Sequence, residues 1–66
     1  MPFNAAKMKQ LRERLDLTQE ALAKRVGVHR VTLTNIESGE ASPTLAVVER
    51  LARVFRVKLD ELIRRR

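Results

Sequence analysis

The sequence predicts a small all-α domain of five helices joined by short turns. Only two glycines and two prolines interrupt the 66 residues, and so few breaks favour helices over a fold rich in turns. Apolar residues recur three and four positions apart, which is the spacing of one helix face. No segment alternates apolar and polar residues between turn signals, as a half-buried strand does. The length suits one domain with one core, which we place at residues 1–66.

Two helices are expected in the first part of the chain. The first spans about residues 4–15, because Asn4 is a favourable N-cap residue. Its apolar face consists of Met8, Leu11 and Leu15. The second begins at Thr18, whose hydroxyl can accept a hydrogen bond from the free amides of the next turn. It ends at Gly27, since a residue without a Cβ readily adopts the left-handed conformation that follows many helices.

Three further helices are expected beyond this turn. The third spans about residues 30–38 and stops at Gly39. The fourth begins after Thr44, a good N-cap residue, and carries the clearest apolar stripe in the chain. This stripe comprises Leu45, Val48, Leu51, Ala52 and Phe55. The fifth is short, at about residues 59–64, and Lys58 is a poor N-cap residue for it.

The composition limits the classes of partner. The net charge is +6, from 14 lysines and arginines against 8 aspartates and glutamates. Such an excess suggests a polyanion partner, although a solvated charged surface explains it equally well. The absence of cysteine excludes disulfides and thiolate metal sites, and we expect neither metal nor cofactor. No apolar run approaches the roughly 20 residues that span a bilayer, and no signal peptide opens the chain. A soluble cytoplasmic protein without a membrane partner is therefore expected.

The informative stretch lies at about residues 18–38. It reads as an N-cap, a helix, a glycine turn and a second helix, which a glycine then stops. Two helices joined by a tight turn containing glycine form a helix-turn-helix, whose second helix enters the major groove of DNA. Ala23 is small enough to let the two helices cross closely. The sequence therefore predicts a DNA-binding motif with residues 30–38 as the recognition helix.

Five short motifs follow one another in a fixed order along the chain. They are LTQEALA at 17–23, VGV at 26–28, IESG at 36–39, PTL at 43–45 and LDEL at 59–62. Together they resemble the phage Cro and repressor family, the XRE-type helix-turn-helix regulators of bacteria, over about residues 5–63. The resemblance implies a compact lambda-repressor-like fold that binds double-stranded DNA sequence-specifically and regulates transcription.

The resemblance also implies which residues read the bases. Arg30, Val31 and Asn35 match base-reading positions of the family. Arginine can bond guanine through two hydrogen bonds, asparagine can bond adenine, and valine can pack against a thymine methyl group. Thr34 lies beside them, and we assign it to base contact as well. For each residue, a merely solvated side chain is the plain alternative.

Other positions are expected to contact the DNA backbone, which positions a protein without specifying sequence. The resemblance gives this role to Gln19, and the amides that follow Thr18 head a helix, where a phosphate binds favourably. Thr32 and Ser42, together with His29 at the start of the recognition helix, complete this set. The family pattern further implies a buried structural ion pair between Arg12 and Glu37.

One recognition helix reads only a few base pairs, so we expect a homodimer on a palindromic operator with half-sites about 34 Å apart. The expected apolar interface comprises Val57, Leu59 and Ile63. The alternative for Ile63 is that it only covers the core. No small-molecule effector is expected, and the protein should associate with the nucleoid.

Three other classes of function compete with DNA binding. A basic amphipathic membrane binder is disfavoured, because such helices do not need a glycine-turned pair. An antitoxin-type module that binds a partner protein and its own promoter remains the alternative. An enzyme is not expected, because the chain has one histidine, no cysteine and no glycine-rich loop. The operator, the regulated genes and the sign of regulation are left open.

Overall fold

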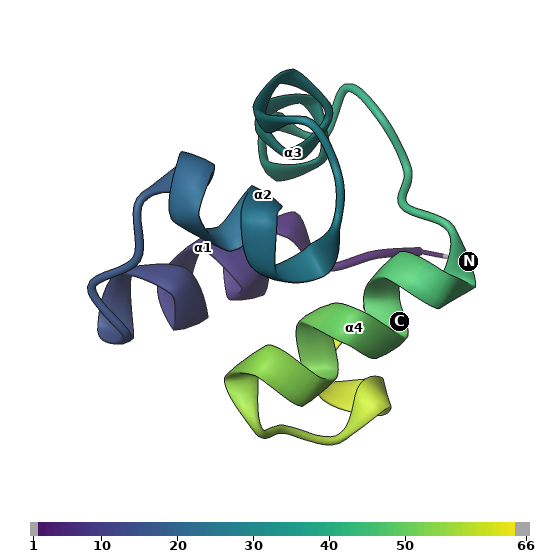
Figure 1. Cartoon of the computed structure of the whole chain (residues 1–66). Helices are drawn as coiled ribbons and strands as arrows, with labels where there is room; N and C mark the ends of the chain where they lie inside the picture. The colour runs from purple at the N-terminus through teal and green to yellow at the C-terminus, as the bar shows by residue number, and fades with distance from the viewer. Residues whose placement is uncertain (1, 65–66) are drawn as a thin grey trace.

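The computed structural model describes residues 2–64 and confirms the all-helical prediction. Within these residues, four α-helices and one 3₁₀ helix follow one another along the chain: α1 (Ala5–Arg14), α2 (Gln19–Val26), α3 (Arg30–Ser38), α4 (Leu45–Phe55) and η1 (Leu59–Leu62). In Figure 1, α3 lies at the top of the molecule and α4 at the bottom, with α1 and α2 between them. None of the described helices is long and apolar enough to cross a membrane.

The helix ends follow the predicted signals closely. The side chains of Asn4, Thr18 and Thr44 each accept a hydrogen bond from the backbone amide three residues later, at 3.0, 3.0 and 3.3 Å. Gly27 and Gly39 follow α2 and α3 with φ angles of 73° and 86°. Because most residues avoid this left-handed region, glycine at these two places lets the chain reverse directly after each helix.

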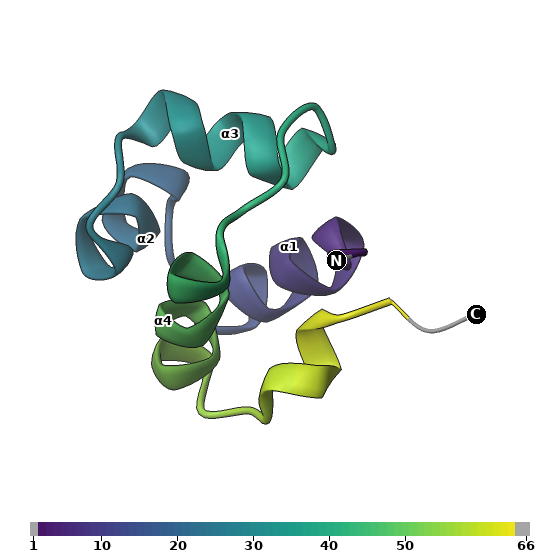
Figure 2. The same ribbon diagram turned by 90° about the vertical axis from the view of Figure 1, so that its right-hand side faces the viewer.

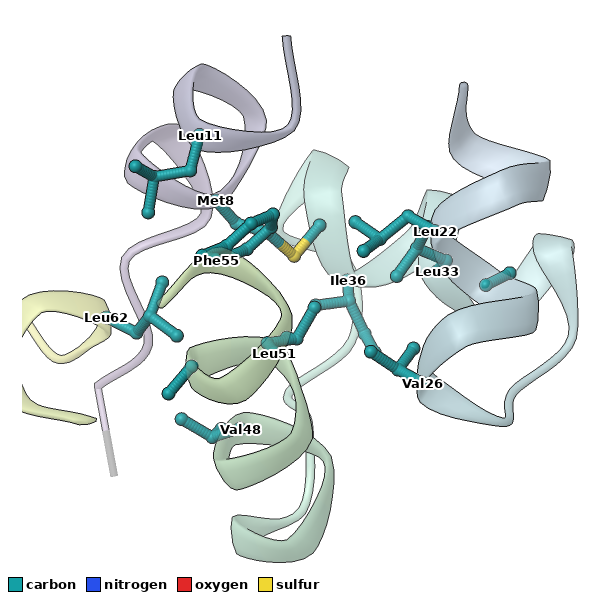
Figure 3. Packing of buried hydrophobic residues seen from close by; sticks show 12 residues of the cluster. Met8, Leu11, Leu22, Val26, Leu33, Ile36, Val48, Leu51, Phe55 and Leu62 are labelled. Atoms are coloured by element: carbon teal, nitrogen blue, oxygen red, sulfur yellow. The ribbon is translucent and has the colours of Figure 1, made fainter. Parts of the chain in front are cut away.

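One hydrophobic core lies where the helices meet. Figure 3 shows that its labelled side chains come from all four α-helices and from η1, and point toward one another. The buried members are Met8, Leu11, Leu22, Ala23, Val26, Leu33, Ile36, Val48, Leu51, Ala52, Phe55 and Leu62. The hydrophobic effect of this burial holds α2 and α3 on a common support formed by α1 and α4.

Two leucines of the predicted apolar faces are not in this core. Leu15 is 46% exposed and Leu45 is 53% exposed. Leu15 follows the last residue of α1, and the left-handed backbone of Asp16 (φ 54°) then turns the chain. Leu45 is the first residue of α4, and helical side chains lean toward the N-terminal end. Helical spacing therefore overestimated the apolar face at these two ends.

The predicted fifth α-helix at residues 59–64 is wrong in type and length. The structure has the short 3₁₀ helix η1 instead, and Ile63 forms an isolated antiparallel bridge with Phe3. The amide of Arg64 also donates to the carbonyl of Pro2 at 2.7 Å. These bonds to the first residues draw the chain out of the helical conformation after η1, as Figure 2 shows at the yellow end of the ribbon.

The start of η1 is better capped than Lys58 as its N-cap residue predicts. The backbone amide of Lys58 donates to a carboxylate oxygen of Glu61 at 3.3 Å. A carboxylate in the first turn that reaches back to the amide before the helix is half of a capping box. Glu61 therefore supplies the capping interaction that the N-cap residue was expected to lack.

Candidate nucleic-acid interface

The two sides of α3 differ sharply in exposure. Leu33 and Ile36 are buried in the core, whereas Arg30, Val31 and Thr32 are exposed. Val31 is 65% exposed although its side chain is entirely apolar. Val31 therefore leaves an apolar side chain accessible on this side of α3, between two polar neighbours.

A single arginine anchors α3 to the rest of the fold. The Nε atom of Arg12 lies 2.9 Å from Oε2 of Glu37, and its Nη2 atom lies 2.9 Å from Oε1. The third nitrogen, Nη1, donates to the carbonyl of Leu17 at 2.7 Å. Only 13% and 5% of the Arg12 and Glu37 side chains are exposed. This two-bond geometry is the strongest form of an arginine–carboxylate contact and joins α1, the start of α2 and α3.

The surroundings of this pair keep both groups charged. Burial raises the pKa of Glu37, but hydrogen bonds from Arg12 and Gln19 outweigh burial and hold that pKa below its usual value. The hydrogen bond to Glu37 in turn raises the pKa of Arg12 further above its already high value, against the opposing effect of burial. The pair therefore stays ionised at neutral pH.

Gln19 connects this pair to the middle of α3. Its Nε2 donates to Oε1 of Glu37 at 3.2 Å, and its Oε1 accepts from the hydroxyl of Thr34 at 3.0 Å. The reversed amide would place its oxygen against the carboxylate, so the partners favour this orientation. The Thr34 hydroxyl also lies 2.9 Å from the carbonyl of Arg30, so its one proton serves two acceptors. Both side chains therefore have partners within the protein.

A polar hollow lies at the beginning of α2. It is lined by Arg12, Thr18, Gln19, Glu20 and Arg30. The free amides and the dipole at a helix N-terminus attract an anion, and Arg30 adds a positive charge at the edge. Glu20 adds an opposing negative charge, so an anion in this hollow lies on the arginine side.

The remaining predicted backbone contacts lie at exposed positions. His29 is the N-cap residue of α3, as expected, but its side chain makes no capping hydrogen bond. Thr32 is exposed on α3, and Ser42 is exposed in the loop between α3 and α4, next to buried Pro43. The imidazole and both hydroxyls are therefore accessible to a molecule that approaches this side of the protein.

Two residues of this region were missed by the sequence analysis. Lys9 lines a second hollow beside α3, together with Gln19, Thr34, Glu37 and Ser38. Its position three residues before Arg12 was a usable signal, since residues so spaced share one helix face. Arg50 donates from Nη1 to the carbonyl of Val26 at 3.2 Å and so satisfies the C-terminal end of α2. No local pattern reveals that contact, because it joins α4 to α2.

The predicted dimer interface lies at the end of the molecule formed by η1 and the preceding loop. Leu59 is 37% exposed, whereas Val57 and Ile63 are partly buried against the core. Ile63 thus packs against the core, and its part in a dimer interface stays a prediction. Within residues 2–64, no three histidine, aspartate or glutamate side chains are grouped to hold a metal ion.

A pair of helices joined by a glycine turn, with one face of the second helix anchored and the other exposed, defines a helix-turn-helix protein. A model of the helix-turn-helix family matches residues 8–62. The chain belongs to this family, and the similarity to phage repressors expected from the sequence is confirmed.

Proteins of similar sequence are named as transcriptional regulators. An uncharacterized HTH-type transcriptional regulator of Archaeoglobus fulgidus is 41% identical over 56 residues, which cover 85% of this chain and 79% of the archaeal protein. The cryptic phage CTXphi transcriptional repressor RstR of Vibrio cholerae is 39% identical over 59 residues, which cover 89% of this chain and 53% of RstR.

Solved structures show the same fold. The P22 c2 repressor, in complex with a synthetic operator, has a TM-score of 0.88 and 25% identity, and the match covers 97% of each chain. The restriction-modification controller protein C.AhdI of Aeromonas hydrophila has a TM-score of 0.83 and 27% identity, with 89% of each chain covered.

Proposed function

We propose that this protein binds double-stranded DNA sequence-specifically, with α3 in the major groove, and so regulates transcription. The observation that carries this proposal is the exposed start of α3, where Arg30 and Val31 point away from a helix that the Arg12–Glu37 pair anchors. A rigidly held helix with free polar and apolar side chains is what base reading requires. The regulator names of the relatives and the operator complex of the P22 c2 repressor support it.

The exposed residues of α3 suit different bases. Arg30 suits guanine, Val31 suits a thymine methyl group, and Asn35, half-buried one turn later, suits adenine. Thr34 already donates its one hydroxyl proton within the protein, so it can donate to a base only by giving up a hydrogen bond. We therefore rank Thr34 below the other three as a source of sequence preference.

The DNA backbone is held by groups on both sides of α3. In this proposal, the hollow at Thr18 and Gln19 takes one phosphate, and Ser42 contacts the backbone beyond the other end of α3. His29 and Thr32 add contacts near the start of the helix. Contacts of this kind fix the register of the protein on the duplex and make its affinity depend on salt.

A symmetric homodimer completes the proposal. Two copies of α3 would read two half-sites about 34 Å apart, and the exposed Leu59, flanked by Val57 and Ile63, is the contact that we assign to the dimer. Sedimentation of the protein with and without DNA tests this assignment, with Leu59→Asp expected to leave a monomer. We place this non-enzymatic regulator in the cytoplasm with the chromosome, and we propose no small-molecule effector.

The function is tested by titrating the protein against DNA from upstream of its own gene, with scrambled DNA as the control, at two salt concentrations. Small regulators often control their own genes, so this fragment is a rational first choice. We expect specific binding to exceed non-specific binding by about a thousandfold or more, and to weaken steeply with salt.

A pair of arginine variants then locates the binding surface. Arg30→Ala should erase the preference for the specific DNA while the circular dichroism spectrum stays helical. Arg14→Ala removes the same charge from an exposed position on α1, away from α3, and should keep the preference. If the protein binds neither DNA at low salt, the proposal of DNA binding is contradicted. Binding to a partner protein then becomes the hypothesis to test.

A further inference from the structure

A groove separates the end of α1 from the end of α4. It has a volume of about 400 Å³ and is lined by Leu15, Leu17, Arg25, Val54, Phe55 and Arg56. None of these residues was assigned a contact with DNA or with a second copy. The groove is therefore a surface that the proposed function leaves unused.

The floor and walls of the groove are apolar. Leu15 is 46% exposed, and it borders Leu17 and Val54, which are only partly buried against the core. Single exposed leucines are common on soluble proteins, but a leucine at the edge of a depression can pack against an apolar side chain that is inserted there. Here four apolar side chains from two segments, the end of α1 with the following turn and the end of α4, meet in one depression.

The backbone fixes Leu15 in this exposed position. Its amide donates to the carbonyls of Leu11 and Arg12, both at 3.2 Å. On the other side, the carbonyl of Leu17 accepts from Nη1 of Arg12 at 2.7 Å. Both ends of the turn are thus bonded to α1. The backbone of the turn is therefore ordered before a partner binds, and binding loses little further backbone entropy.

The charged residues that line the groove are both arginines. Arg25 lies in the last turn of α2, and Arg56 caps the end of α4 with a φ angle of 57°. Both are exposed. An apolar floor between two guanidinium groups fits a segment that combines a large apolar side chain with carboxylates, because the arginines can bond the carboxylates at the rim.

We propose that this groove binds an acidic segment of another protein, which inserts an apolar side chain between Leu15 and Val54. The ends of α1 and α4 lie well below α3 in Figures 1 and 2, so the partner can bind while α3 lies on DNA. A second copy of this chain is a poor occupant, because a symmetric contact would bring its own arginines against Arg25 and Arg56. Nucleic acid fits less well, because the four apolar side chains of the lining offer no hydrogen-bonding groups to bases.

The test uses a labelled short peptide with leucines one helical turn apart among glutamates. Fluorescence anisotropy gives its affinity, and the amide shifts of the labelled protein locate its site. We expect shift changes centred on Leu15, Leu17 and Val54, with or without DNA. A peptide with lysine in place of glutamate, and one with serine in place of leucine, should both bind much more weakly.

Matched variants separate the groove from general effects. Leu15→Ser should weaken binding about tenfold or more, since it removes one leucine from the contact, whereas Leu45→Ser changes an equally exposed leucine elsewhere and should have no effect. Arg25→Glu should weaken binding, whereas Arg53→Glu, the same reversal outside the groove, should not. All four residues are exposed, so the fold should survive.

Several results would overturn the proposal. Binding that Leu15→Ser leaves unchanged, or shift changes centred on α3, would show that the peptide only mimics DNA. Displacement of the peptide by DNA would lead to the same conclusion. Self-association that Leu15→Ser abolishes would make a second copy the occupant. No binding even at millimolar peptide would show that the groove does not recognise this chemistry.

Discussion

Arg12 contacts more parts of the molecule than any other charged residue discussed above, since it bonds Glu37 twice and the carbonyl of Leu17 once. Arg12→Ala would leave the nearly buried Glu37 carboxylate without its cation, at a cost of about 3–5 kcal/mol. A domain of this size has a total stability of only about 3–10 kcal/mol. We therefore expect Arg12→Ala to lose a large part of its stability, seen as a much lower urea midpoint when unfolding is followed by circular dichroism.

The double variant Arg12→Met/Glu37→Leu distinguishes a missing partner from a general loss of packing. Replacing both charges with apolar side chains removes the unpaired carboxylate, so the double variant should be more stable than Arg12→Ala. It should not reach the wild-type stability, because Gln19 and the carbonyl of Leu17 also lose partners. A double variant less stable than Arg12→Ala would contradict this account.

Glu37 makes the stability depend on pH in a defined direction. Its pKa in the folded protein lies below the ordinary value of 4.5, so the unfolded chain takes up the proton first as the pH falls. The stabilisation is complete above about pH 4.5 and is lost as the pH falls through the folded pKa. We expect Glu37→Gln to flatten the fall in urea midpoint between neutral pH and about pH 3. Glu13→Gln, an exposed change on α1, should leave that fall as it is.

Gly39 isolates the cost of a left-handed backbone. Its φ angle is 86°, and an added Cβ would meet no atom within 4 Å. Gly39→Ala should therefore destabilise the fold by about 1 kcal/mol through backbone strain alone. Gly39→Asn should cost less, since asparagine tolerates this region better. An unchanged urea midpoint in Gly39→Ala would mean that the turn can rearrange.

At the scale of single elements, α3 is the helix with the weakest start. α1, α2 and α4 each begin with a side-chain cap, whereas His29 provides none. His29→Ser should therefore stabilise the protein by about 0.5–1 kcal/mol, seen as a higher melting temperature, and His29→Ala should change little. A lower melting temperature for His29→Ser would show that the imidazole has a stabilising contact of its own.

The helices also show which features of the fold local sequence patterns can predict. Caps at Thr18 and Thr44 and the glycine stops were predictable, because each depends on residues within one turn of the helix end. The conformation of residues 63–64 was not predictable, because hydrogen bonds to residues 2–4 override helical spacing after η1. Leu15 was misplaced for a related reason: periodicity gives the face of a helix but not the residue at which the helix ends.

The candidate site likewise has features that the sequence predicts and contacts that it does not. Sequence resemblance proposed which residues of α3 face DNA, and the structure shows Arg30, Val31 and Thr32 exposed there. It could not show that Gln19 and Thr34 bond each other, because those positions are far apart in sequence and their contact depends on how α2 crosses α3. The exposed groove beside Leu15 likewise exists only once α1 and α4 are packed.

At the scale of the whole molecule, the two ends of the described chain are joined. Phe3 packs partly buried against the core and forms a bridge with Ile63. Phe3→Ala should therefore lower stability by about 2 kcal/mol, less than for a fully buried phenylalanine. Leu45→Ala removes an apolar side chain from an exposed position and should change stability by less than about 0.5 kcal/mol. Equal effects of the two changes on the melting temperature would contradict a structural role for the joined ends.

The joined ends also set an order for folding. The contact between Phe3 and Ile63 closes almost the entire chain into a loop, whereas α2 and α3 meet across a turn of a few residues. Closing a long loop loses more chain entropy than closing a short one, so we expect the helix-turn-helix to form before the ends join. Substitutions at the joined ends should then act mainly on the rate of unfolding, and the recognition helix should be among the first parts of each molecule to become native.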